Sequence, residues 1–251
     1  MTMNKAWHRA HPMPARATRA QRLAWHESHA KACGCRPIPA GLQRQLGAAA
    51  PARRRLRYGV AISLDGFIAG TKGEFDWIVM DPAIDFGAMY REFDTAVMGR
   101  KTHEVMKAME GGHGALPGID DTVVFSRTLR PATYRRVRIT REDPRRLVQE
   151  LKARPGKDIW LYGGGRLFRY LLDAGLVDTV EVAVIPVILG AGIPLLQPGD
   201  KTKLVLTDFK RLPKTGTVFL SYSIPGGVGP APRIRFIRRR AGAAKKAVKK
   251  R

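Results

Sequence analysis

The fold is decided by the stretch Asp158-Ile159-Trp160-Leu161-Tyr162-Gly163-Gly164-Gly165-Arg166-Leu167-Phe168. It opens with a short apolar run rich in β-branched and aromatic residues, which is typical of a buried strand, and three glycines follow directly. From Arg166 to Asp173 the apolar residues then recur at helical spacing. The stretch therefore predicts a strand, a glycine turn and a helix.

The glycine turn suits an anionic ligand. Glycine has no Cβ, so a phosphate can approach the backbone of Gly163, Gly164 and Gly165 closely. The first N–H groups of the following helix, and the positive end of its dipole, point at the same place. Three glycines can equally form a tight crossover in an α/β sheet, and their spacing is not the GxGxxG of a Rossmann unit. The rest of the sequence is needed to distinguish a phosphate-binding turn from a structural crossover.

Strands and helices alternate along the chain on both sides of this turn. The pattern predicts strands at 56–63, 95–98, 121–125, 137–140 and 179–189, and helices at 83–93, from about 99 and at 144–154. Two further strands, 204–212 and 217–224, flank Pro213-Lys214-Thr215-Gly216 and predict an antiparallel hairpin. The order predicts an α/β sandwich with a mixed sheet.

Composition limits the class of protein. The chain has 251 residues, of which 44% are hydrophobic, so it can bury a real core. Because it has neither a long uncharged apolar run nor an apolar N-terminal stretch of the signal-peptide kind, we expect no membrane span and a cytoplasmic location. Its two cysteines, Cys33 and Cys35, lie too close together to build a disulfide scaffold.

The net charge of +24 lies mainly at the two ends. Residues 1–57 hold 12 Lys or Arg and one acid, and residues 226–251 hold 10 Lys or Arg and none. The residues between them carry a net charge of only +3. We therefore expect one folded domain at 56–225 between basic, disordered segments at 1–55 and 226–251.

The N-terminal segment also contains four of the six histidines, as His8-x2-His11 and His26-x2-His29, followed by Cys33-Gly34-Cys35. Such side chains can gather a zinc ion, but a Cys-x-Cys pair is tighter than the usual spacing of structural sites. The segment has little apolar periodicity. The expectation is a disordered leader, with at most a transient helix over 15–32, and no metal site.

Five short motifs occur in one order, and their spacing is that of a known group of enzymes. They are Ser63-Leu64-Asp65-Gly66, Met98-Gly99-Arg100-Lys101-Thr102, Ser126-Arg127, Gly163-Gly164-Gly165, and Pro186 to Leu195 with its two glycines. Together they resemble the dihydrofolate reductase superfamily, and within it the branch with the reductase domain of bacterial riboflavin biosynthesis. The resemblance spans about Leu56 to Ile224. It implies a three-layer α/β/α fold with a mixed, mostly parallel central sheet that ends in the antiparallel hairpin.

The resemblance also implies NADPH as cofactor and hydride transfer to a small pteridine-like, pyrimidine-like or carbonyl substrate. Arg100 and Lys101, at the start of a helix, are then expected to contact the cofactor's phosphates, while Ser126 and Arg127 take the adenosine 2′-phosphate. Each of these residues could instead be an ordinary surface or capping residue. The full implied cofactor set is Ala61, Gly99, Arg100, Lys101, Thr102, Ser126, Arg127, Gly163, Gly164, Gly165, Arg166 and Leu167.

A carboxyl group with a raised pKa would suit proton delivery to the substrate. The resemblance offers two positions, Asp65 in the Ser-Leu-Asp-Gly turn and Asp85 on the helix after the first strand, with a slight preference for Asp65. Asp65 could simply form a turn with Gly66, and Asp85 could cap its helix.

Two further expectations concern partners. The resemblance implies a homodimer that uses the apolar segment from Ile185 to Leu196. The alternative function is that of a nucleic-acid-associated protein, because the acid-free basic segment at 226–251 favours non-specific contact with a polyanion.

Overall fold

This computed structural model describes residues 4–15, 17–33, 35, 54–109 and 114–229. The chain divides into two compact units, Met1–Arg53 and Arg54–Arg251, so the second unit begins two residues before the predicted domain. Residues 36–53 and 230–251 lie outside the described residues, and the disorder predicted for them stays a prediction. Among the described residues, no helix has the length and apolar character needed to cross a bilayer.

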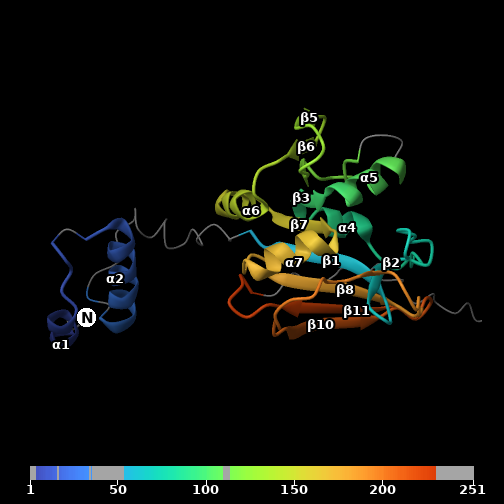
Figure 1. The fold of residues 1–251 in the computed structure, drawn as a ribbon. Coiled ribbons are helices and arrows are strands. Elements are labelled where there is room, and N and C mark those ends of the chain that lie inside the picture. The colour runs from blue at the N-terminus through green and yellow to red at the C-terminus, as the bar shows by residue number, and fades with distance from the viewer. Residues whose placement is uncertain (1–3, 16, 34, 36–53, 110–113, 230–251) are drawn as a thin grey trace, which may run out of the picture. The chain divides into compact units, whose positions relative to one another are not determined.

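The first unit contains two helices, α1 (Lys5–Ala10) and α2 (Arg19–Ala32) (Figure 1). Asn4 caps α1 through a bond from the Trp7 amide. Thr18 and Gln21 form a capping box at the start of α2, which satisfies two N–H groups that the helix leaves unpaired. The expected disorder is therefore wrong for α1, whereas α2 lies within the stretch 15–32 for which a transient helix was predicted.

The second unit is built on strands that closely follow the predicted pattern. Their bounds are β1 (Leu56–Ser63), β2 (Phe67–Ala69), β3 (Phe93–Gly99), β4 (Asp121–Phe125), β5 (Ala132–Tyr134), β6 (Val137–Thr140), β7 (Asp158–Gly163), β8 (Thr179–Ile185), β9 (Ile193–Pro194), β10 (Val205–Arg211) and β11 (Val218–Ser223).

The main sheet among the described residues has the order β10-β11-β8-β1-β7-β3-β4-β6-β5. The run from β8 to β6 is parallel, while β5 at one edge and the β10–β11 hairpin at the other are antiparallel. The short strands β2 and β9 pair with each other in a separate small sheet. The prediction of a mixed, mostly parallel sheet that ends in a hairpin is confirmed.

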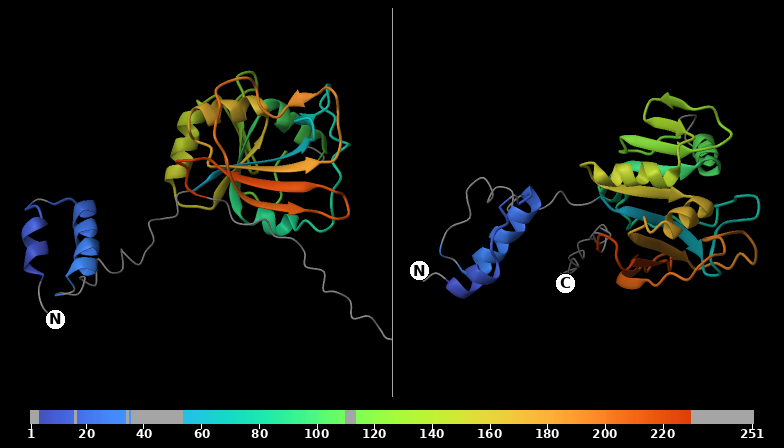
Figure 2. Two further views of the ribbon diagram at one scale, coloured as in Figure 1. Left: turned by 90° about the horizontal axis from the view of Figure 1, so that it is seen from below. Right: turned by 60° about the vertical axis from the view of Figure 1, so that its left-hand side comes forward.

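Helices of the described residues cover both faces of this sheet (Figure 2). They are α4 (Phe86–Tyr90), α5 (Arg100–Met109), α6 (Pro144–Ala153) and α7 (Gly165–Asp173). Successive side chains of a strand point to opposite faces, so Ile159 and Leu161 pack with α6 and α7, while Trp160 packs with α4 and α5. Apolar residues therefore fill both interfaces, and the predicted three-layer α/β/α sandwich is confirmed.

Two elements are shorter than predicted. The helix expected over 83–93 is reduced to α4, because Asp85 caps it at one end and Phe93 already belongs to β3. The strand expected over 179–189 with a break at Pro186 ends at Ile185, because Pro186 has no N–H for the ladder and the strand does not resume over 187–189.

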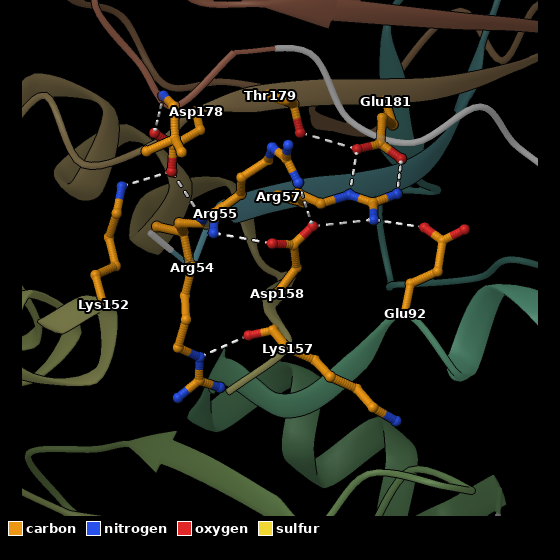
Figure 3. Close-up of polar contacts among 12 residues, drawn as sticks. Arg54, Arg55, Arg57, Glu92, Lys152, Lys157, Asp158, Asp178, Thr179 and Glu181 are labelled. Atoms are coloured by element: carbon orange, nitrogen blue, oxygen red, sulfur yellow. Dashed lines mark hydrogen bonds and ion pairs between the residues drawn. The ribbon is translucent and has the colours of Figure 1, made fainter. Parts of the chain in front are cut away.

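A network of buried charges lies at the amino ends of β1, β7 and β8 (Figure 3). Arg57 is 1% exposed, and its guanidinium donates to both carboxylate oxygens of Glu181, at 2.8 and 2.7 Å. It also donates to Glu92 at 2.6 Å. Asp158 joins the network by accepting from the Arg55 amide at 3.0 Å. The amino ends of these strands therefore carry structural ion pairs. Open parallel sheets bind ligands at the opposite, carboxyl ends of their strands.

Candidate active site

The predicted site residues gather at the carboxyl edge of the parallel strands. Two neighbouring strands, β3 and β7, end side by side there, with Met98 paired to Gly163. The helices that follow them leave in opposite directions, because α5 packs on one face of the sheet and α7 on the other. Such a change of direction opens a crevice outside the strand ends, the usual ligand site of an open α/β sheet.

The glycine turn forms one wall of this crevice. Gly163 has a φ of 149°, a conformation that favours glycine, and the Gly163–Gly164 peptide bond is cis. Cβ atoms placed on Gly163 and Gly164 would lie 3.2 and 3.4 Å from Oγ1 of Thr102. Gly164 is the N-cap of α7 without a side-chain capping bond, so the first amides of the helix are open to a ligand.

The start of α5 forms the opposite wall. A Cβ on Gly99 would meet nothing within 4 Å, so the strand end faces open space. Thr102 is half-buried beside the glycine turn and joins the two walls. The Arg100 guanidinium is bonded to Glu104 at 2.7 and 2.9 Å, an exposed pair within one helix that a phosphate can displace.

The end of β4 supplies the next pair of predicted residues. Ser126 is buried, and its hydroxyl oxygen accepts from the amides of Thr128 and Leu129 at 3.2 and 2.9 Å. This bonding shapes the loop and presents Arg127, which is exposed. Its oxygen also lies 3.5 Å from the Thr128 hydroxyl, so Ser126 is a loop-forming residue.

Three cations at this edge are exposed: Lys101, Arg127 and Arg166. Within the part of the chain that the structure describes, none of them forms an ion pair with an acid. Unpaired cations beside two helix starts make a region of positive potential that attracts an anionic ligand.

Two members of the implied set contribute in other ways. Leu167 packs in the apolar cluster under α7, so only its backbone N–H faces the turn. Ala61 is half-buried in β1, opposite Ala183 of β8, where its small side chain leaves room above the strand.

Asp65 lies two residues after β1 and is exposed. Its carboxylate accepts from the Gly190 amide at 2.7 Å and from the Leu189 amide at 3.2 Å. A hydrogen bond from Ser63, together with these two amides, lowers the pKa of Asp65 below its usual value. The raised pKa expected of a proton donor is not present at Asp65, which instead clasps the loop after β8.

Asp85 is the N-cap of α4, and its Oδ1 accepts from the Ala88 amide at 2.8 Å. Its Oδ2 accepts no hydrogen bond from the described residues. The nearby Asp81 is 2% exposed and accepts from the Ala83 amide and the Thr215 hydroxyl. It ties the segment before α4 to the turn between β10 and β11.

Sequence analysis missed the small sheet of β2 and β9, whose strands of two and three residues carry no periodicity. A Cβ on Gly165 would lie 3.1 Å from the carbonyl oxygen of Pro194 and 3.0 Å from that of Leu195. The segment at β9 therefore packs directly on the start of α7. The missing Cβ of Gly165 permits this approach, and that of Gly192, in the motif from Pro186 to Leu195, permits the close packing of β9 on β2.

The sequence model of the RibD C-terminal domain matches residues 54–219. The chain belongs to the RibD C-terminal domain family. It is 36% identical over 152 residues to the uncharacterised protein YyaP of Bacillus subtilis, an alignment that covers 57% of this chain and 80% of YyaP.

Solved structures agree on the fold. RibD of Acinetobacter baumannii aligns with a TM-score of 0.53 at 20% identity, covering 72% of this chain and 61% of that one. Dihydrofolate reductase of Enterococcus faecalis, determined with NADP(H) and RAB-propyl, aligns with a TM-score of 0.51 at 17% identity, covering 69% of this chain and 98% of that one. The fold is of the dihydrofolate reductase type, as the five motifs predicted.

Proposed function

We propose that this protein is an NADPH-dependent reductase that transfers a hydride to a small pteridine-like, pyrimidine-like or carbonyl substrate. Membership of the RibD C-terminal domain family supports an oxidoreductase. The observation that carries the proposal is the close approach of Thr102, at the start of α5, to the glycine turn at Gly163, at the edge of the sheet where exposed cations follow three strand ends.

The residues present fit a dinucleotide cofactor. The open amides at the start of α7 and the missing Cβ atoms of the glycine turn suit a pyrophosphate, and Lys101 and Thr102 lie on the opposite wall. Arg100 joins them when a phosphate replaces Glu104. Bound NADPH supplies the hydride, while the chain holds and orients it beside the acceptor.

Arg127 is the residue that favours NADPH over NADH. It is exposed, follows the end of β4, and is presented by the turn that Ser126 closes. A guanidinium binds a terminal phosphate through two parallel N–H bonds, a contact that NADH cannot offer.

We propose different roles for the two aspartates. Asp65 is held ionised by its hydrogen bonds and keeps the loop after β8 against the turn that follows β1. Asp85 has one oxygen committed to its helix and a second that accepts nothing from the described residues. That second oxygen can bind a polar substrate atom and hold it in place for reduction.

The experiment is hydride transfer from stereospecifically deuterated NADPH to a panel of aminopyrimidines, dihydropteridines and simple carbonyl compounds. We expect deuterium in one product class, and at least about tenfold less with Asp85→Asn. Asp120→Asn is the matched control, because Asp120 is an exposed acid immediately before β4, at the opposite edge of the sheet. No deuterium in any product would contradict the reductase assignment.

A homodimer is part of the same proposal. The segment from Ile185 to Leu196 exposes Ile188, which is 70% accessible, and a second copy could cover it. Sedimentation equilibrium on the full chain and on Ile188→Asp tests this. A monomeric wild-type chain would refute it.

A further inference from the structure

Four metal-binding side chains meet in the first unit, far in sequence from the reductase motifs. They are His8 on α1, His29 on α2, and Cys33 and Cys35 just after α2. One ligand atom from each lies within 4.8 Å of the other three. Neither cysteine forms a disulfide bond.

The distances within this cluster are those of a tetrahedral zinc site. Nε2 of His8 lies 3.5 Å from Sγ of Cys33 and 3.6 Å from Sγ of Cys35, and Nε2 of His29 lies 3.3 Å from Sγ of Cys35. Zinc bonds of about 2.3 Å to sulfur and about 2.0 Å to nitrogen, at the tetrahedral angle, separate a sulfur and a nitrogen ligand by about 3.5 Å. Each of these three pairs therefore has the separation of two ligands on one zinc ion, and the three pairs together include all four residues.

The helical structure brings these residues together, which their spacing in the sequence did not predict. His29 and Cys33 are four residues apart, so they project from the same face at the end of α2. The Cys33 amide donates to the His29 carbonyl at 2.7 Å, and the Asn4 amide donates to Sγ of Cys33 at 3.0 Å. A backbone N–H directed at sulfur is a typical outer partner of a metal-bound thiolate.

Aromatic rings support the histidines. Trp25 stacks on His29 with 4.9 Å between ring centroids, and Trp7 contacts both rings, at 5.4 Å each. His8 lies 5.0 Å from His29. The two helices thus meet through these rings, and the imidazoles are held with their Nε2 atoms toward the two sulfurs.

Few residues of the first unit are buried, among those whose side-chain exposure is described. Of these, only His29 and Cys33 are buried, at 3% and 5% exposure. A unit of this size cannot gain enough stability from so little burial, and small units of this kind are commonly stabilised by disulfides or a metal. The Cys-x-Cys spacing is tighter than the usual spacing of structural zinc sites, but here α1 and α2 each supply one further ligand, His8 and His29.

We propose that His8, His29, Cys33 and Cys35 form a structural zinc site that holds α1 against α2. Four protein ligands close the coordination shell, so the ion has no open position for a substrate. Binding displaces the thiol protons of both cysteines into solvent. This revises the sequence-based expectation that the chain has no metal ligands, and it does not depend on the reductase assignment.

The test is the metal content of the full chain purified without chelators, measured by plasma mass spectrometry. We expect about one zinc ion per chain, and a loss of about tenfold or more in Cys33→Ser and in Cys35→Ser. His26→Ala is the matched control, because His26 lies on the same helix and stacks edge-on against Trp25 outside the cluster. It should retain the zinc.

Cobalt substitution keeps the test decisive if a cysteine variant fails to fold. Wild-type chain reconstituted with Co²⁺ should show the intense visible bands of a tetrahedral ion and the near-ultraviolet absorption of cobalt–thiolate bonds. Three results would overturn the proposal: wild-type chain without bound zinc, zinc retained when both cysteines are replaced by serine, or the weak spectrum of octahedral cobalt. A disulfide between Cys33 and Cys35 would appear as two missing thiols and would likewise overturn it.

Discussion

Thr102 and Gly163 come from different helix–strand units, yet a Cβ on Gly163 would lie 3.2 Å from Oγ1 of Thr102. The contact joins the start of α5 to the glycine turn before α7 across the carboxyl edge of the sheet. The two helices lie on opposite faces of the sheet, and this contact brings the start of α5 close to the turn that begins α7. The predictions for the cofactor site follow from it.

Replacing Gly163 by alanine should damage this site. The added methyl would press on Thr102 and narrow the space for a phosphate, and a φ of 149° costs a residue with a Cβ about 1–3 kcal/mol. We expect the NADPH affinity of Gly163→Ala to fall about tenfold or more, measured by isothermal titration calorimetry.

Gly175→Ala is its control. Gly175 also has a positive φ, of 66°, but a Cβ there would meet nothing within 4 Å, and it follows α7 at the far end from the turn. This variant should lose stability and keep its NADPH affinity. Equal losses of affinity in both variants would mean that backbone strain, rather than obstruction of the site, explains the effect.

The ion network at the other edge of the sheet should control stability. Glu181→Gln removes the charge that neutralises the Arg57 guanidinium in a buried position. We expect a loss of about 3–5 kcal/mol in the free energy of unfolding, measured by urea denaturation.

The exposed pair of Arg146 and Glu150 on α6 gives the comparison, at 3.1 Å and with Arg146 78% exposed. Glu150→Gln should change the free energy of unfolding by less than about 1 kcal/mol, since exposed pairs are solvated in both states. Similar costs for the two substitutions would contradict a special role for the buried network.

The hydrogen bonds to Asp65 predict a pH dependence of stability. The pKa of Asp65 is lower in the folded chain than in the unfolded one, so its contribution is complete above the unfolded-state value and is lost as the pH falls. Between about pH 5 and pH 3 the wild-type chain should therefore lose more stability than Asp65→Asn does. Parallel urea midpoints for the two proteins across this range would show that Asp65 is not stabilised by its bonds to the loop after β8.

Removal of the basic segment at 230–251, which lies outside the described residues, tests the alternative function of nucleic-acid binding. Residues 230–251 contain all ten cations of the C-terminal segment. Removing them should lower the affinity for duplex DNA at low salt and flatten its dependence on salt concentration, with no change in NADPH affinity. If DNA binding survives the truncation, the segment is not the site of polyanion contact.

Much of the second unit could be predicted from local patterns. The strands at 56–63, 121–125 and 137–140 have the bounds predicted, because β-branched runs between turn residues define them locally. The strands β2, β5 and β9 could not be predicted, since each is two or three residues long and exists only through its pairing partner.

The candidate site likewise has parts that the local sequence predicts and parts that it does not. The glycine turn, the start of α5 and Arg127 could be located from their positions after strands. The bonding of Asp65 to Gly190 and the approach of Thr102 to Gly163 depend on how distant segments pack, which no local spacing contains. In the first unit, α2 lies within the predicted transient helix at 15–32, whereas α1 and the meeting of the two helices were not predicted, because histidine, cysteine and tryptophan contacts rather than an apolar stripe hold them together.

The central claim is tested most directly by titrating the full chain with NADPH and with NADH, alongside Arg127→Ala. A 2′-phosphate contact of the charge-assisted kind contributes about 1.5–3 kcal/mol. The wild-type chain should therefore bind NADPH about tenfold or more tightly than NADH, and Arg127→Ala should weaken NADPH binding to the level of NADH without affecting NADH. Failure of the wild-type chain to bind either dinucleotide would contradict the account.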